Sequence, residues 1–161
     1  IGIEISNPGH NYNYKKFSKK QIHSVLKLTK YLIKKYKIKN KFILGHSDIA
    51  PFRKKDPGEK FPWKYLSKKK VGLWHDLNEK KLLKVREKKV DKYDEINFFK
   101  NLYKIGYRYF SLKKRKIKKD KKIIKAFQLR FLPKRVSGNL DQKTLKISYY
   151  LATSYKILKK P

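Results

Sequence analysis

Hydrophobic and polar residues at the start of the chain follow first the period of a strand and then that of a helix. Residues 1–6 alternate isoleucine with small or polar residues, which is typical of a strand. Ser18 and Gln21 then form the sequence of a capping box, so we expect a helix to begin at Ser18. Apolar residues at helical spacing extend this helix to about Tyr36. A second apolar run, residues 42–45, predicts a short strand leading into a loop rich in Pro, Gly and charged residues.

The rest of the chain has a mainly helical pattern. Short helices are expected over residues 62–68, 94–105, 121–131 and 141–157. Gly106 is placed to end the second of these helices, and the Asp141 carboxylate is placed to cap the last. Residues 78–92 are charged and lack a clean apolar stripe, so we interpret them as a linker or a solvated helix. The chain is therefore expected to divide into units at 1–77 and 93–161.

The composition indicates a folded chain with a very high positive charge. The 161 residues include 46 Lys or Arg and 12 Asp or Glu, which gives a formal net charge of +34, while 39% of the residues are hydrophobic. Only six of the basic residues are Arg, and the Lys residues are spread nearly evenly. A nucleic-acid interface would cluster its charge and use more Arg, so this spread disfavours a specific nucleic-acid binder. Non-specific adhesion to polyanions follows from the charge in any case.

Several features are absent from the sequence. Cys does not occur, which excludes disulfides and thiolate metal ligands. No apolar run approaches the roughly 18–20 residues of a membrane span, and this chain carries no targeting signal. The chain begins at Ile1 with what looks like the middle of a strand, so we expect an incomplete N-terminus. A signal or a membrane anchor would then have to be encoded upstream.

Histidines and a few carboxylates are the candidates for a metal or acid–base site. His46 and Asp56 lie on one loop, and an imidazole and a carboxylate are both good ligands for a cation such as Zn²⁺. Their spacing alone is also that of a solvated loop with a plain turn at Asp56. Glu4 lies between Ile3 and Ile5 and so points to the opposite face from both. If that face is buried, the Glu4 carboxylate needs a polar partner or has a functional role. If the strand is half-exposed, the carboxylate is simply solvated.

The other three histidines carry less information. His23 lies beside the apolar stripe of the predicted helix, in line with several Lys residues, which indicates a surface position. The spacing of His10 and His75 assigns neither of them a role.

Two stretches of the sequence resemble a known enzyme family. The strings IGIEISNPGHNYNY, FILGHSDIAPFRKKDPGEKFPW and GLW resemble the zinc-dependent N-acetylmuramoyl-L-alanine amidases of type 2, whose fold is shared with peptidoglycan recognition proteins. The strings IIKAFQLRFLP and VSGNLDQKTL look like a peptidoglycan-binding helical module, which points to the cell-envelope subgroup. The resemblance implies an α/β fold, with an N-terminally truncated mixed β-sheet and flanking helices over residues 1–77. A linker over 78–92 and a small three-helix, peptidoglycan-binding-like domain over 93–161 would follow.

The resemblance also implies roles for four residues. His46 and Asp56 would be two of the ligands of a Zn²⁺ cofactor, Glu4 the general base, and Lys54 the cation that stabilises the oxyanion. Family members take a third ligand, a His, from a strand that would lie upstream of Ile1. Catalytic zinc normally has three protein ligands plus water, so two would hold the ion loosely. His10 is the alternative third ligand within this chain.

The function implied by the resemblance is hydrolysis of the amide bond between N-acetylmuramic acid and L-alanine. The substrate and partner would be peptidoglycan or muropeptides, in cell-wall turnover or recycling, at the envelope or in the periplasm of a bacterium. The alternative is a non-catalytic peptidoglycan-binding remnant that lacks a zinc ligand. A basic nucleic-acid binder is a third reading, which the even spread of Lys disfavours. Intact wall and released muropeptide are not distinguished by the sequence, and neither is the oligomeric state.

Overall fold

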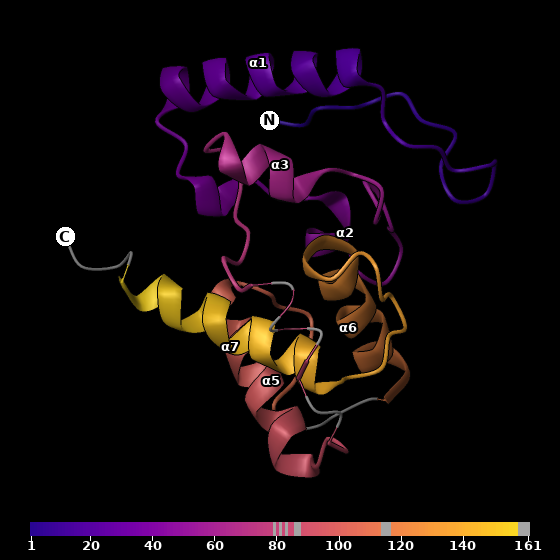
Figure 1. The fold of residues 1–161 in the computed structure, drawn as a ribbon, viewed down its shortest axis with the longest axis vertical. Coiled ribbons are helices and arrows are strands. Elements are labelled where there is room, and N and C mark those ends of the chain that lie inside the picture. The colour runs from indigo at the N-terminus through magenta and orange to yellow at the C-terminus, as the bar shows by residue number, and fades with distance from the viewer. Residues whose placement is uncertain (79, 81, 83, 86–87, 114–116, 158–161) are drawn as a thin grey trace.

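The computed structural model describes residues 1–78, 80, 82, 84–85, 88–113 and 117–157 (Figure 1). Its helices, in chain order, are α1 Lys19–Tyr36, the short 3₁₀ helix η1 Asn40–Phe42, α2 His46–Ile49, α3 Trp63–Lys68, α5 Lys92–Ile105, α6 Ile117–Phe131 and α7 Gln142–Ile157. Within the described residues no helix is long and apolar enough to cross a membrane.

The first long helix, α1, begins where the sequence predicts. The Gln21 backbone N–H donates to the Ser18 hydroxyl oxygen at 3.2 Å, and the Ser18 N–H donates to the Gln21 side-chain oxygen at 2.9 Å. These two bonds form the predicted capping box, because each satisfies a donor that the first turn of a helix leaves without a partner. The helix ends after Tyr36, where Lys37 adopts a left-handed conformation with φ of 51°.

The predicted mixed β-sheet is wrong: the described part of the chain contains helices and irregular segments but no strand. Residues 1–6 are mostly exposed, and the Ser6 carbonyl accepts a hydrogen bond from the Gln21 side chain at 2.6 Å. In the second predicted strand, Phe42 closes η1, and the Ile43 carbonyl accepts from Arg130 at 3.0 Å. Alternating residues indicate an extended segment with two faces, but a strand also needs backbone partners on a neighbouring strand. The polar partners of these carbonyls are side chains instead.

The N-terminal half packs around a small cluster between α1 and α3. Its buried members are Ile22, Phe61, Trp63, Leu66 and Val71. The predicted turn or two of helix at 62–68 is confirmed as α3, and Figure 1 shows it lying between α1 and the rest of the molecule. This cluster fixes the polypeptide on either side of the loop that carries His46 and Asp56.

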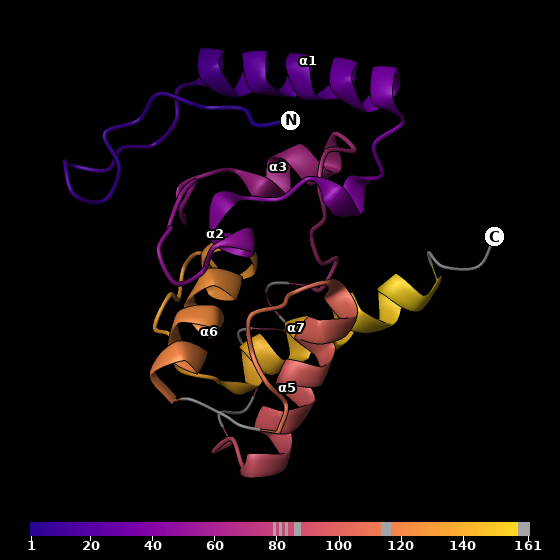
Figure 2. The same cartoon turned by 180° about the vertical axis from the view of Figure 1, so that it is seen from behind.

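The three helices predicted for the C-terminal half are present. Helix α5 lies alongside α7, as both views show, and the two helices make extensive contact (Figures 1 and 2). Gly106 ends α5 as predicted, while α6 begins four residues earlier than expected, at Ile117. The core between the three helices contains side chains with no exposed surface: Phe98, Phe99, Leu102, Ile123, Phe127 and Ile147.

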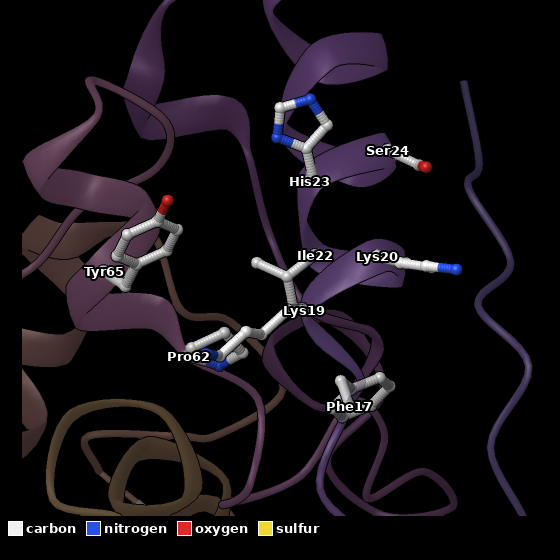
Figure 3. Close-up of a pocket in the computed structure, with 8 residues that line it drawn as sticks. All are labelled: Phe17, Lys19, Lys20, Ile22, His23, Ser24, Pro62 and Tyr65. Carbon is white, nitrogen blue, oxygen red and sulfur yellow. The ribbon is translucent and has the colours of Figure 1, made fainter.

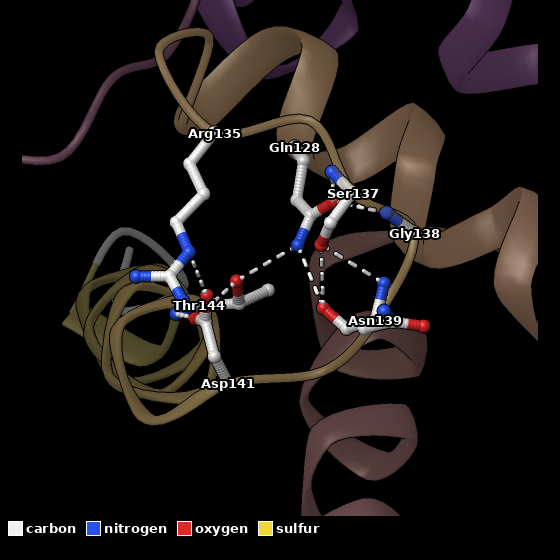
Figure 4. A network of polar contacts seen from close by, with 7 residues as sticks. All are labelled: Gln128, Arg135, Ser137, Gly138, Asn139, Asp141 and Thr144. Atoms are coloured by element: carbon white, nitrogen blue, oxygen red, sulfur yellow. Dashed lines mark hydrogen bonds and ion pairs between the residues drawn. The ribbon is translucent and has the colours of Figure 1, made fainter. Parts of the chain in front are cut away.

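Gln128 of α6 organises the turn before α7 (Figure 4). Its side-chain oxygen accepts from the backbone N–H groups of Ser137 and Gly138, at 3.0 and 2.8 Å. Its amide nitrogen donates to the Asn139 carbonyl at 2.9 Å and to the Thr144 hydroxyl at 3.2 Å. One fully buried side chain therefore takes the place of the backbone partners that this turn lacks.

Part of the predicted linker, residues 79, 81, 83 and 86–87, lies outside the described residues. Within the described part, Leu82 is buried and belongs to the core of the C-terminal helices. The division into two domains remains a prediction. The two halves touch where α2 packs against α6.

Candidate functional site

The loop from His46 to Asp56 brings two of the predicted site residues together. His46 opens α2, and the His46 Nδ1 atom lies 3.0 Å from Asp56 Oδ2. The loop folds back on itself because the Ser47 backbone N–H donates to the Asp56 carbonyl at 2.9 Å, and the Ala50 N–H donates to the His46 carbonyl at 2.8 Å. The two side chains, ten residues apart in sequence, are 42% and 59% exposed, so both are accessible from solvent.

His46 and Asp56 offer the types of donor atom that zinc binds, but a catalytic zinc site normally has three protein ligands and this pair supplies two. An imidazole nitrogen and a carboxylate oxygen 3.0 Å apart are close enough to contact one ion at the usual 2.0–2.2 Å, about the spacing of neighbouring ligands in a tetrahedron. Among the described residues, however, no group of three or more His, Cys, Asp or Glu is placed to hold a metal. His46 and Asp56 thus supply two protein donors of the right chemistry.

Of the other two predicted residues, Lys54 lies on the same loop and Glu4 lies elsewhere. The Lys54 backbone N–H donates to the Ala50 carbonyl at 3.0 Å, and its side chain is partly buried. Glu4 is exposed on the irregular N-terminal segment. In the described chain it does not join His46 and Asp56 in a common ligand group. The structure therefore brings together His46 and Asp56, with Lys54 on their loop, and the role of Glu4 as general base stays a prediction.

His10, the alternative third ligand, has other partners. Its Nε2 atom lies 2.9 Å from Glu59 Oε2, and its ring stacks on Tyr14 with 4.3 Å between centroids. Partial burial raises the pKa of Glu59, but the hydrogen bond with His10 and nearby positive charge outweigh it, so the pKa lies below its usual value. Burial raises the pKa of Tyr14 to about 12, and its hydroxyl donates to the Pro57 carbonyl at 2.6 Å. This cluster fastens the residues after Asp56 to the loop at 10–14.

The remaining histidines are placed as follows. His23 is exposed on α1, as its position beside the apolar stripe predicts. His75 is buried, with its ring stacked on Trp74 and its Nε2 atom 3.1 Å from the Phe131 carbonyl.

Three buried polar residues next to the loop were missed by the sequence reasoning. Asp48, two residues after His46, forms an ion pair with Arg130 of α6, and both side chains are 3% exposed. The Tyr107 hydroxyl donates to Asp48 Oδ1 at 2.5 Å. Burial, and then the negative charge of Asp48, raise the pKa of Tyr107 well above its usual value. The one available signal was the use of Arg at position 130 in a chain that has only six Arg residues.

An open groove of about 860 Å³ lies between the start of α1 and α3 (Figure 3). Its lining includes Ile22 and His23 from α1 and Pro62 and Tyr65 from the α3 side. In Figure 3 Lys20 and Ser24 point away from Tyr65. None of the four predicted site residues lines this groove, so it is separate from the His46 loop.

Comparison with known proteins identifies the loop as part of a family sequence. Residues 1–59 match the family described as N-acetylmuramoyl-L-alanine amidase. The chain is 30% identical over 166 residues to N-acetylmuramoyl-L-alanine amidase AmiD of Escherichia coli strain K12, covering 96% of this chain and 57% of AmiD. It is 44% identical over 69 residues to 1,6-anhydro-N-acetylmuramyl-L-alanine amidase AmpD of Haemophilus influenzae, covering 42% of this chain and 35% of AmpD.

Solved structures extend the similarity over most of this chain. The complex of E. coli AmiD with anhydro-N-acetylmuramic acid-L-Ala-D-γ-Glu-L-Lys aligns with a TM-score of 0.77 and 29% identity, over 89% of this chain and 55% of that one. AmpDh3 of Pseudomonas aeruginosa aligns with a TM-score of 0.74 and 27% identity, over 90% of this chain and 57% of that one. The chain thus spans about half the length of these relatives or less. By sequence over residues 1–59, and by structure over most of its length, the chain is related to the type 2 N-acetylmuramoyl-L-alanine amidases.

Proposed function

We propose that this chain acts in hydrolysis of the amide bond between N-acetylmuramic acid and L-alanine in muropeptides, as part of peptidoglycan turnover in a bacterial envelope. The observation that carries the proposal is the 3.0 Å contact between His46 and Asp56, within the segment that matches the amidase family. A muropeptide substrate is supported by the relatives. AmpD is named for the 1,6-anhydro sugar, and AmiD was solved with an anhydromuropeptide.

In this proposal His46 and Asp56 would hold a zinc ion. When bound, the ion would supply an acidified water and a Lewis acid for the amide carbonyl. Glu4 takes the proton from the attacking water and passes it to the nitrogen of the leaving L-alanine, whose bond to the lactyl carbonyl breaks. The Lys54 ammonium stabilises the negative charge that develops on the carbonyl oxygen. Glu4 is exposed on the N-terminal segment, so its carboxylate is accessible to water.

A third metal ligand completes the proposed site. By the family resemblance this ligand would be a His from a segment before residue 1. His10 is less suited to this role, because its ring already pairs with Glu59 and stacks on Tyr14. With His46 and Asp56 alone, exchange with water would dilute the effect of the ion on water acidity and on the carbonyl.

The test measures zinc content and turnover in the 161-residue chain and in a version extended at its N-terminus with the segment that carries the third His. We expect weak zinc binding and little release of peptide from an anhydromuropeptide by the chain alone, and stoichiometric zinc with turnover in the extended version. His46→Ala and Asp56→Ala should abolish both in the extended version. His23→Ala, which changes an exposed histidine on α1, is the matched control and should change neither. Full zinc retention in His46→Ala would overturn the proposed ligand.

A second candidate, a binding module that recognises muropeptide without cutting it, is favoured by the two-donor count among the described residues. It predicts that the 161-residue chain binds the anhydromuropeptide, by calorimetry, with unchanged affinity after removal of zinc. Release of free peptide, detected by chromatography, would exclude this alternative.

A further inference from the structure

Asp48 connects the predicted metal loop to the C-terminal helices. Its Oδ2 atom accepts from the Gly45 backbone N–H at 2.8 Å and from the Arg130 guanidinium, and its Oδ1 atom accepts from the Tyr107 hydroxyl at 2.5 Å. Arg130 is 82 residues further along the chain, and Tyr107 is 59 residues further. Two of the three donors to this buried carboxylate therefore come from the C-terminal half of the molecule.

Arg130 holds the chain on both sides of His46. Besides its ion pair with Asp48, its second terminal nitrogen donates to the Ile43 carbonyl at 3.0 Å. Its guanidinium also lies 4.1 Å from the centre of the Trp63 ring, a cation–π contact that keeps the side chain in place. Figures 1 and 2 both show α2 resting on the end of α6. A planar guanidinium can make these contacts at once, whereas a Lys ammonium cannot match the same fork.

The turn is also packed tightly against the residue that follows Asp56. A side-chain carbon added at Gly45 would lie 2.8 Å from Pro57 and 3.3 Å from Trp63. The backbone bond between Ser47 and Asp56 adds a second link. Because the space around Gly45 is already filled, the start of α2 cannot move toward Pro57 without displacing it.

A buried ion pair is weak evidence of stabilisation, since replacing it with apolar side chains of similar volume often leaves the stability of a protein unchanged or higher. Such pairs can instead fix one geometry, because each charge is costly to bury without its partner. Here the geometry they fix is that of the turn bearing His46.

We propose that Arg130 and Tyr107 are positioning residues, which act through Asp48 to hold the His46 imidazole against Asp56. The C-terminal helices would then serve the metal loop itself, apart from any contact with peptidoglycan. The importance of this role for catalysis rests on the proposed function. The positioning of His46 does not, because it can be measured without metal.

The first experiment uses Tyr107→Phe, which removes one hydroxyl and keeps the ring. Tyr150→Phe is the matched control, since its hydroxyl donates to Asp76 in an exposed contact of 3.3 Å that does not involve Asp48. Imidazole nitrogen–proton spectra of the metal-free chain report on each of its four histidines. We expect the His46 signals to shift or split in Tyr107→Phe and to stay unchanged in Tyr150→Phe, with the His23 signals unchanged in both.

The second readout is zinc affinity, measured by competition with a chelator after the same substitutions are made in the version extended at its N-terminus. Loss of a supporting contact outside the ligands typically costs 10–100-fold in metal affinity, and we expect about tenfold for Tyr107→Phe. If the extended version binds no zinc, the proposed function fails, and the metal-free spectra decide the positioning role.

Removing Arg130 alone would leave Asp48 buried without its partner, so that variant could fail to fold. The paired variant Asp48→Asn with Arg130→Met removes both charges and is expected to fold. Its melting temperature is measured beside its His46 signals. A folded paired variant with altered His46 signals supports the proposal. A lower melting temperature with His46 signals and zinc affinity as in the unmodified chain would overturn it, because the pair would then serve packing alone.

Discussion

At the scale of single residues, Gln128 shows what a buried amide does when all of its bonding capacity is used. It makes three hydrogen bonds to the turn before α7 and one to Thr144 of α7, and it has no exposed surface. A buried polar group that lacks a hydrogen-bond partner lowers the free energy of unfolding by about 1–3 kcal/mol. The Gln128 amide provides partners for several backbone groups at once.

Gln128→Leu should therefore lower the free energy of unfolding by roughly 2–4 kcal/mol, because the N–H groups of Ser137 and Gly138 would lose their acceptor. Urea unfolding followed by circular dichroism measures this. Gln142→Leu is the control, since that side chain makes a partly exposed hydrogen bond to Asp94 and should cost less than about 1 kcal/mol. Equal costs for the two variants would contradict the prediction.

The pair of Glu59 and His10 makes a pH-dependent contribution. The folded pKa of Glu59 lies below its ordinary value of 4.5, so its stabilising effect is fully present above pH 4.5. It is lost as the pH falls through the folded pKa. Wild type should exceed Glu59→Gln in unfolding free energy at pH 7, and the difference should shrink as the pH is lowered from 5 to 3. If the difference in unfolding free energy grew on acidification, the folded pKa of Glu59 would lie above its ordinary value, contrary to this prediction.

Sequence reasoning succeeded for residues whose partners are close along the chain and failed for those with distant partners. Ser18 finds its partner three positions away, so the capping box could be read directly. The contact of Asp48 with Arg130 joins positions 82 residues apart, and no local pattern encodes it. The family motif led to His46 and Asp56, and the structure gave their distance. The role of Glu4, assigned by the motif alone, stays a prediction.

At the scale of elements, helices were predicted well and strands were not. A helix satisfies its backbone bonds within one segment, so periodicity and caps are enough to find α1, α5 and α7. A strand depends on a neighbour, and the apolar alternation of residues 1–6 carries no information about one. The predicted sheet was wrong because the sequence pattern indicates an extended segment but says nothing of the neighbouring strand that a sheet requires.

The cap of α1 allows a direct test of an element boundary. Ser18→Ala removes the acceptor for the Gln21 N–H and should cost about 1 kcal/mol of unfolding free energy. Ser24→Ala, an exposed position within the same helix, is the control and should be neutral or slightly stabilising. Thermal unfolding of the two variants compares them, and a larger loss for Ser24→Ala would refute the assigned start of α1.

At the scale of the whole molecule, the net charge of +34 opposes compaction. Salt screens this repulsion, with a Debye length that falls from about 30 Å at 0.01 M to about 8 Å at 0.15 M. The melting temperature should therefore rise between these concentrations of sodium chloride. Sucrose at matched osmolarity is the control for effects that do not involve charge. A melting temperature that falls with salt would mean that attractive ion pairs outweigh the repulsion.

The anchoring of the His46 turn by Arg130 has a consequence for the order of events during synthesis. The ribosome makes the turn 82 residues before it makes its anchor, which at 5–20 residues per second is a delay of roughly 4–16 s. During that interval the nascent loop has His46 and Asp56 but not the Arg130 side chain that anchors their turn. The turn would then be held in place only after translation of α6, and a chain released from a ribosome that stalled before this helix would keep an unanchored loop.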